Sequence, residues 1–145
     1  MDSTPRIFQL PEMADILGVE IAKAKNWTNG RTGLIIKPSI RESTGTGKSD
    51  LYSLEDLYLM ALANEFSKAG LAAKAIGKLI EAIKSKFDSI SDSSWLTIWR
   101  PEAGGNFRLA EGRDRPPKAI LWMALSVREL LRGVEEKLEA KDRRR

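Results

Sequence analysis

The side chains best suited to chemistry lie in two short basic stretches of the N-terminal half. The first is residues 44–49, TGTGKS. A glycine-rich loop ending in Lys-Ser can cradle phosphate with its backbone N–H groups. The complete phosphate-loop pattern fails, because its first glycine falls on Glu42, whose carboxylate would repel phosphate. The same loop suits a hairpin tip at which Thr46 and Lys48 donate to the oxygens of a nucleic-acid backbone.

The second stretch is residues 22–27, AKAKNW, within a predicted helix. Lys23 and Asn26 are i, i+3 neighbours, and Lys25 is about 100° around the helix from Asn26. An asparagine amide can pair with N6 and N7 of adenine, whereas lysine suits phosphate or guanine. We therefore expect Lys23 and Asn26 near DNA bases and Lys25 near phosphate, with Trp27 packed beneath the helix. An ordinary solvated helix face is the alternative.

Positive charge is concentrated in the same region. Residues 20–49 hold six basic and two acidic residues, which accounts for the whole net charge of +4. Such local concentration favours an anionic partner, nucleic acid first. Arg31, Lys37 and Arg41 flank the predicted hairpin and are expected to neutralise DNA phosphates, although they could serve solubility alone.

Several functions are excluded by composition. The 145 residues include no His and no Cys, which removes Cys/His zinc sites, thiolate chemistry and Ser-His-Asp catalysis. No cluster has catalytic or metal-ligand spacing, so we expect neither an enzyme nor a cofactor or metal. With no apolar run of 18 residues and no leader, a cytoplasmic protein without membrane contact is expected.

The elements that must position these residues are mainly helical. Pro11 opens a short helix that Gly18 closes, and residues 19–27 form the next, so a helix-turn-helix is predicted. Residues 34–40 and 51–52 read as a hairpin, the wing. Ser53 caps a third helix that ends at Gly70, and a fourth runs from 71 to about 87. Residues 6–87 are thus predicted to form one DNA-binding domain.

A second region follows a predicted polar linker, DSISDSS at residues 88–94. Residues 95–99 and 107–109 look like paired strands, residues 119–125 favour a strand over a helix, and Ser126 with Glu129 caps a helix to about residue 141. We expect residues 95–142 to be a dimerisation or effector region. An a/d seam of that last helix would carry the dimer contact, formed by Val127, Leu131, Val134 and Leu138.

Aromatic residues of this second region allow two interpretations. Trp95, Trp99, Phe107 and Trp122 could line a ligand pocket, or they could simply make the core of a small domain, which is the commoner role. A small-molecule sensor is therefore one alternative for the C-terminal region.

Five motifs, in order over about residues 7–84, resemble the DNA-binding domain of the MerR family of bacterial transcriptional regulators, a winged helix-turn-helix. They are Phe8 with Glu12-Met13-Ala14, the Gly18-Val19 turn, Gly33-Leu34-Ile35 with Pro38, Tyr52-Ser53-Leu54-Glu55-Asp56-Leu57, and Gly70-Leu71 with Ile76.

This resemblance implies a recognition helix that ends at Lys25, Asn26 and Trp27, where the family has Arg and two aromatics. The family's usual wing Arg is Asp50 here, so the corresponding phosphate contact would be lost or would move to Lys48 or Arg41. The family's thiol-based metal sensing is excluded, because the chain has no cysteine.

The sequence thus predicts a mainly α protein with a little β structure: a winged helix-turn-helix followed by a small hairpin and helix. The expected function is a bacterial, sequence-specific transcriptional regulator that binds double-stranded DNA as a homodimer. The alternative is an excisionase-like architectural factor or an anti-repressor that recruits a protein partner. A small-molecule or protein effector acting through the C-terminal region is compatible with either.

Overall fold

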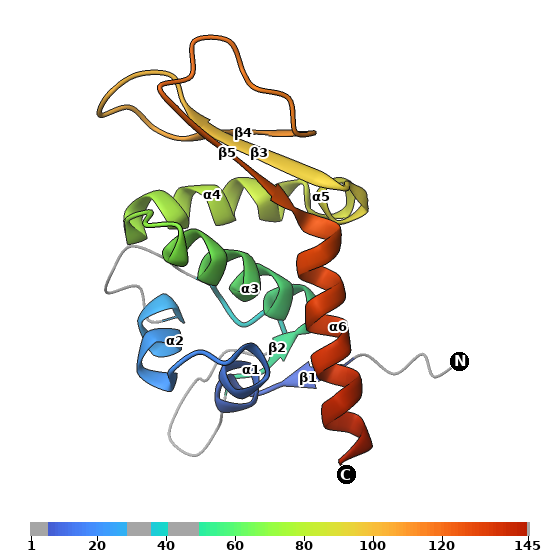
Figure 1. The fold of residues 1–145 in the computed structure, drawn as a ribbon. Helices are drawn as coiled ribbons and strands as arrows, with labels where there is room; N and C mark the ends of the chain where they lie inside the picture. The colour runs from blue at the N-terminus through green and yellow to red at the C-terminus, as the bar shows by residue number, and fades with distance from the viewer. Residues whose placement is uncertain (1–5, 29–35, 41–49, 145) are drawn as a thin grey trace.

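The computed structural model describes residues 6–28, 36–40 and 50–144. In chain order the elements are β1 (Ile7–Phe8), α1 (Leu10–Leu17), α2 (Ile21–Thr28), β2 (Tyr52–Ser53), α3 (Leu54–Lys68), α4 (Ala73–Ser85), α5 (Phe87–Asp92), β3 (Trp95–Arg100), β4 (Arg108–Glu111), β5 (Leu121–Ser126) and α6 (Val127–Arg143). The mainly helical architecture with small antiparallel sheets agrees with the predicted fold class (Figure 1).

Local capping signals account for several of the helix boundaries. Proline occupies the first turn of α1, and Gly18 ends that helix in the left-handed region at φ 67°, a conformation that glycine adopts without steric cost. Ser53 caps α3 in a complete capping box: its hydroxyl accepts from the Asp56 N–H while the Asp56 carboxylate accepts from the Ser53 N–H. At α6 the Ser126 hydroxyl accepts from the Glu129 N–H at 3.3 Å.

Three strands form the C-terminal sheet in the order β4-β3-β5, with both pairs antiparallel. The prediction of a strand over residues 119–125 is confirmed for residues 121–125, since β5 spans Leu121–Ser126. Leu96 and Ile98 of β3 are fully buried. As Figure 1 shows, the sheet lies over α4 and α5, so these two side chains close the upper side of the helical core.

The prediction of a polar linker at residues 88–94 is wrong. Phe87–Asp92 form helix α5, and Ile90 is only 1% exposed. Phe87 and Ile90 are i, i+3 neighbours, so one turn of helix presents both to the protein interior while the intervening Asp88 and Ser89 are exposed. Polar residues dominate the composition of this segment, so its composition indicates a linker although the spacing of its two apolar residues is helical.

The expected separation into a domain 6–87 and a region 95–142 is not seen in the packing. Helix α6 packs against α1, α3 and α5, which all lie in the N-terminal part of the chain or at the expected boundary. A single core joins buried residues of both parts, among them Met13, Leu57, Ile83, Leu96 and Val134. Figure 1 shows α6 running alongside the N-terminal elements from the sheet down to α1.

The prediction of a dimer seam on α6 needs a correction, because this helix packs against other elements of the same chain. Val127, Leu131, Val134 and Leu138 are each 9% exposed or less, and they are buried in the chain's own core. A heptad stripe indicates that a helix covers an apolar surface, but it does not say whether that surface belongs to another copy or to the same chain. These four residues are therefore not available on the surface for a partner.

Tyr58 links α3 to α6 by donating a hydrogen bond from its hydroxyl to Glu135 Oε1 at 3.3 Å. Burial raises the pKa of Tyr58 to about 12, and the Glu135 carboxylate adds to the shift. Because the unfolded phenol has a pKa of about 10, the stability contributed by this group is present below about pH 10 and is lost as pH rises toward 12.

We therefore expect the free energy of unfolding to fall between about pH 10 and 12, and to fall less steeply in Tyr58→Phe. Urea unfolding at several pH values measures both slopes. Tyr52, the chain's other tyrosine, also has a raised pKa because of its burial, so part of the slope remains in the variant. Identical slopes in the two proteins would contradict the assignment to Tyr58.

Candidate nucleic-acid interface

The first feature of the candidate site is the tight turn between α1 and α2. Gly18 directs its N–H back to the Ala14 and Asp15 carbonyls, and the Val19 N–H donates to Ala14 O at 2.9 Å. The Ala24 N–H then bonds to Glu20 O at 3.0 Å within the first turn of α2. This turn fixes the direction in which α2 leaves α1, and the two helices pack against each other.

Helix α2 has one buried and one exposed face. Ala24 is fully buried and Trp27 is 4% exposed, which confirms that Trp27 packs in the core. The Trp27 carbonyl also accepts from the Ile36 N–H at 3.0 Å, which ties the end of α2 to the 36–40 segment. Lys25 and Asn26 are exposed on the opposite side. The helix is thus held by two apolar side chains while its polar residues face solvent.

Lys23 differs from the other two polar residues of the helix. It is half-buried, and its Nζ lies 5.3 Å from the centroid of a Trp27 ring. A lysine above an indole face is stabilised by a cation–π interaction of about 0.5–1 kcal/mol at an exposed site. Lys23 therefore sits at the margin of the exposed face, while Lys25 and Asn26 lie fully on it.

The segment that carries Lys37 is held beside the helices by a hydrogen-bond network centred on the Asp56 carboxylate. This carboxylate is 1% exposed and accepts from the Ser53 N–H at 2.9 Å, the Ser39 N–H at 2.9 Å and the Ser39 hydroxyl at 2.7 Å. The Ser39 hydroxyl also lies 2.7 Å from the Ser53 hydroxyl. The cap of α3 thereby anchors the segment that carries Lys37.

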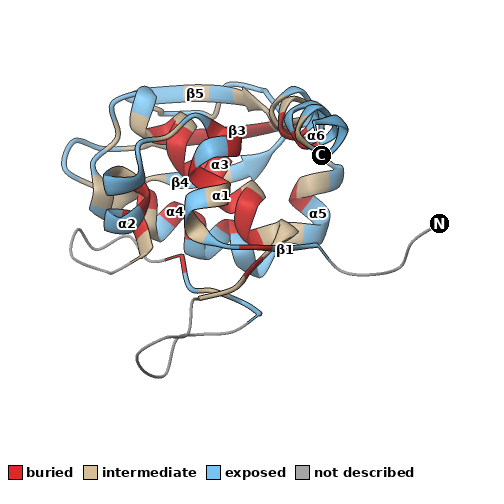
Figure 2. Cartoon of the chain, turned by 90° about the horizontal axis from the view of Figure 1, so that it is seen from below, coloured by how far each residue is buried: buried red, intermediate tan, exposed pale blue. Residues whose placement is uncertain are grey.

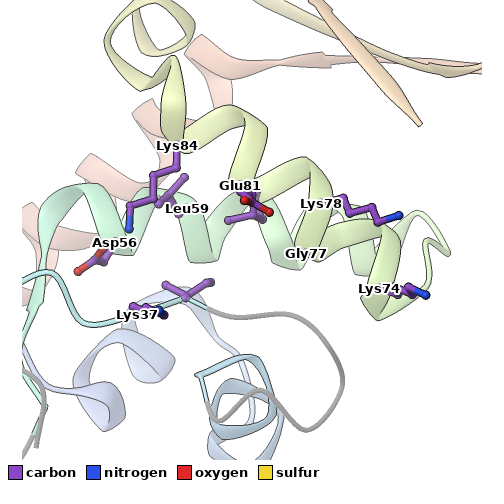
Figure 3. Close-up of a pocket in the computed structure, with 10 residues that line it drawn as sticks. Lys37, Asp56, Leu59, Lys74, Gly77, Lys78, Glu81 and Lys84 are labelled. Carbon is purple, nitrogen blue, oxygen red and sulfur yellow. The ribbon is translucent and has the colours of Figure 1, made fainter. Parts of the chain in front are cut away.

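A cavity of about 540 Å³ opens between this segment, α3 and α4 (Figure 3). Its apolar lining comes from Ile36, Leu59 and Ile80. Its charged lining comprises four lysines and two acids, Lys37, Lys74, Lys78, Lys84, Asp56 and Glu81. In Figure 3 the Lys84 side chain points toward Asp56, while Lys74 and Lys78 extend outward from α4.

The α4 lysines were missed by the sequence analysis, which followed only the basic cluster of residues 20–49. The signal was present in the helical spacing: Lys74 and Lys78 are i, i+4 neighbours on the face opposite the buried Ile76, Leu79, Ile80 and Ile83. One of them is already engaged, because Lys78 Nζ donates to Asn106 Oδ1 at 3.1 Å.

The other predicted DNA contacts, Arg31, Arg41, Thr46 and Lys48, lie outside the described residues, as do residues 34–35 of the expected first wing strand. Between the two predicted wing segments, the structure describes the hydrogen bond from the Ile40 N–H to Leu51 O at 3.1 Å. The strand at Tyr52 pairs instead with β1, in the register Ile7↔Ser53 and Phe8↔Tyr52.

The four aromatic residues of the C-terminal region have different surroundings in the described part of the chain. Phe107 lines a cavity of about 600 Å³ between the sheet and the start of α4, and none of the three tryptophans is among its lining residues. Trp99 and Trp122 are cross-strand neighbours in the sheet. The ring of Trp95 lies 5.6 Å from the Arg113 guanidinium.

Replacing Asp56 with alanine tests how firmly the Lys37 segment is held. The variant loses the side-chain half of the α3 capping box and leaves the Ser39 and Ser53 donors without their acceptor, so we expect the free energy of unfolding to fall by about 2–4 kcal/mol. Chemical denaturation measures this loss. Glu65→Ala, at the exposed end of the same helix where Glu65 pairs with Lys68, is the control and should change it by less than about 0.5 kcal/mol. Equal losses would contradict the anchoring role.

No protein-family model matches the chain, and no curated protein gives a significant match. Among the described residues, none of the helices is long and apolar enough to cross a membrane.

Proposed function

We propose that this chain is a sequence-specific DNA-binding transcriptional regulator that acts as a homodimer, with α2 as the helix that enters the major groove. The observation that carries the proposal is the arrangement of α2. Ala24 and Trp27 fasten it to the protein directly after the Gly18 turn, and Lys25 and Asn26 are exposed on the side away from the core. A rigid helix with an exposed amide and cation is what base and phosphate recognition require.

Within this proposal the residues have separate roles. Asn26 reads a base edge, Lys23 reaches bases from the margin of the helix, and Lys25 binds phosphate. Lys37, exposed and anchored through the Asp56 network, contacts the backbone beside α2. The roles of Arg31, Arg41, Thr46 and Lys48 as wing contacts belong to the same proposal, as do the winged helix-turn-helix fold and the kinship with MerR regulators.

The test is fluorescence anisotropy of the full chain on duplex DNA from its own upstream region and on a scrambled duplex, each across a salt series. We expect the upstream duplex to bind about 10³-fold or more tightly than the scrambled one at physiological salt. The logarithm of the affinity should fall with the logarithm of salt concentration with a slope of about −0.9 for each phosphate neutralised. Equally weak binding to both duplexes would contradict sequence-specific recognition by this chain at that site.

A further inference from the structure

Strand β5 is an unprotected edge of the C-terminal sheet. It lies at one end of the order β4-β3-β5 and carries no charged residue, whereas the opposite edge strand β4 carries Arg108 and Glu111. Proteins usually place charges on sheet edges to prevent pairing with other chains. Large apolar side chains are nevertheless exposed here: Ile120 is 62%, Leu121 41% and Trp122 38% exposed. Figure 2 shows β5 as a largely exposed strand at the rim of the molecule.

The hydrogen-bond pattern shows which residues of this edge are open to a partner. The Val127 N–H donates to Ser94 O at 3.1 Å, in line with the antiparallel register of β3 and β5. Bonding in such a ladder alternates, so residues 121, 123 and 125 direct their backbone groups to β3. Trp122 and Ala124 therefore direct both N–H and C=O outward, away from the sheet.

These two residues make the edge complementary to itself. If β5 strands of two copies run antiparallel around a two-fold axis at Met123, Trp122 of each copy lies opposite Ala124 of the other. Both pairs are hydrogen-bonded pairs, and each places a large side chain beside a small one. Leu121 likewise lies opposite Leu125 on the other face. The same patch then serves both copies, as a two-fold dimer requires.

We propose that two copies of this chain associate through antiparallel pairing of β5 with β5, centred on Met123, to form one six-stranded sheet β4-β3-β5-β5-β3-β4. This inference rests on the proposed function for its biological role, because it supplies the contact of the proposed homodimer. The structural case for it comes from the sheet edge alone. It also replaces the α6 seam, whose four apolar residues are buried within the chain.

Two variants test the pairing by sedimentation analysis of the full chain from about 1 to about 100 μM. Ala124→Pro removes an N–H that points outward, so no β3–β5 hydrogen bond is lost, and the dimer dissociation constant should rise at least 100-fold. Ile7→Lys, which places a charge at another exposed apolar residue (49% exposed), should leave that constant unchanged. Thermal melting of each variant verifies that it is folded.

A cross-linking experiment fixes the register independently, because the chain has no cysteine of its own. In Met123→Cys the two sulfur-bearing residues form a non-hydrogen-bonded pair with Cα atoms about 4.5 Å apart, within reach of a disulfide. In the matched control Ala124→Cys the two residues are offset along the strands by two positions, more than about 7 Å apart. We expect mild oxidation to give a covalent dimer of the first variant only.

A monomer at every concentration, an Ala124→Pro dimer as stable as the original, or equal cross-linking of the two cysteine variants would each overturn the β5 interface. The DNA anisotropy experiment fails or succeeds separately. A β5-linked dimer that binds no DNA would refute the proposed function and leave this interface standing. Specific DNA binding by a monomer would refute this interface and the homodimer, and leave the proposed DNA recognition by α2 standing.

Discussion

Replacing Lys25 with glutamate should weaken binding of the full chain to its specific duplex by about 10²–10³-fold. The change removes a cation from the exposed face of α2 and places a carboxylate where a phosphate is expected. The buried face of the helix, formed by Ala24 and Trp27, is untouched, so the thermal midpoint should stay within about 2 °C. Anisotropy on the specific and scrambled duplexes measures the effect.

Arg128→Glu is the matched control for this variant. It makes the same change in net charge at an exposed residue in the first turn of α6, near the sheet and away from α2 (Figure 1). Its affinity should fall by less than about threefold, as expected of a distant charge screened by salt. If both variants lost affinity equally, the effect would be one of net charge and α2 would not be the contact.

Asn26→Ala separates base reading from general attraction. An amide that pairs with adenine contributes about 1–3 kcal/mol of discrimination, so affinity for the specific duplex should fall about 5- to 150-fold. Affinity for the scrambled duplex and the salt slope should remain unchanged, because no charge is altered. A parallel loss on both duplexes would show that Asn26 does not read a base.

Replacing Val134 with aspartate should unfold most of the protein rather than dissociate a dimer. Val134 is 3% exposed, on the face of α6 that packs against α1, α3 and α5, so the variant would bury a carboxylate without a partner. We expect a loss of several kcal/mol, comparable with the whole stability of a domain this size. Val134→Ala, which leaves only a small cavity, should cost about 1–3 kcal/mol.

Circular dichroism and urea unfolding measure these losses, and Glu136→Ala on the exposed face of α6 serves as the control. The unfolding midpoints should not depend on protein concentration beyond the effect of the β5 dimer, because the seam is intramolecular. If Val134→Asp were a folded monomer of undiminished stability, Val134 would have to lie on the surface, which would contradict the packing of α6 within the chain.

Several expectations that depended on neighbouring residues agree with the structure. The Gly18 stop, the Ser53 cap and the Ser126 cap follow from hydrogen bonds and backbone conformations that span only a few residues. The same holds for the strand at residues 121–126 and for the burial of Trp27 in the core.

The candidate site was predictable only in part. The basic and amide residues of α2 could be found because they share one short helix. The Asp56 network could not, since Ser39 and Asp56 are 17 residues apart and nothing in their spacing indicates that they meet. Lys74, Lys78 and Lys84 come to the same cavity as Lys37 only because α4 folds back over α3.

The sequence by itself therefore determined most of the helices, the strands of the C-terminal sheet and which side of several helices is apolar, but it missed α5 and β1. Only the tertiary structure decided what each apolar side covers. The α6 stripe would look the same whether it met another copy or the chain's own core, and β1 pairs with β2 across more than 40 residues. The reason is physical: caps and turns are settled by bonds between near neighbours, whereas burial depends on which distant surfaces fit together.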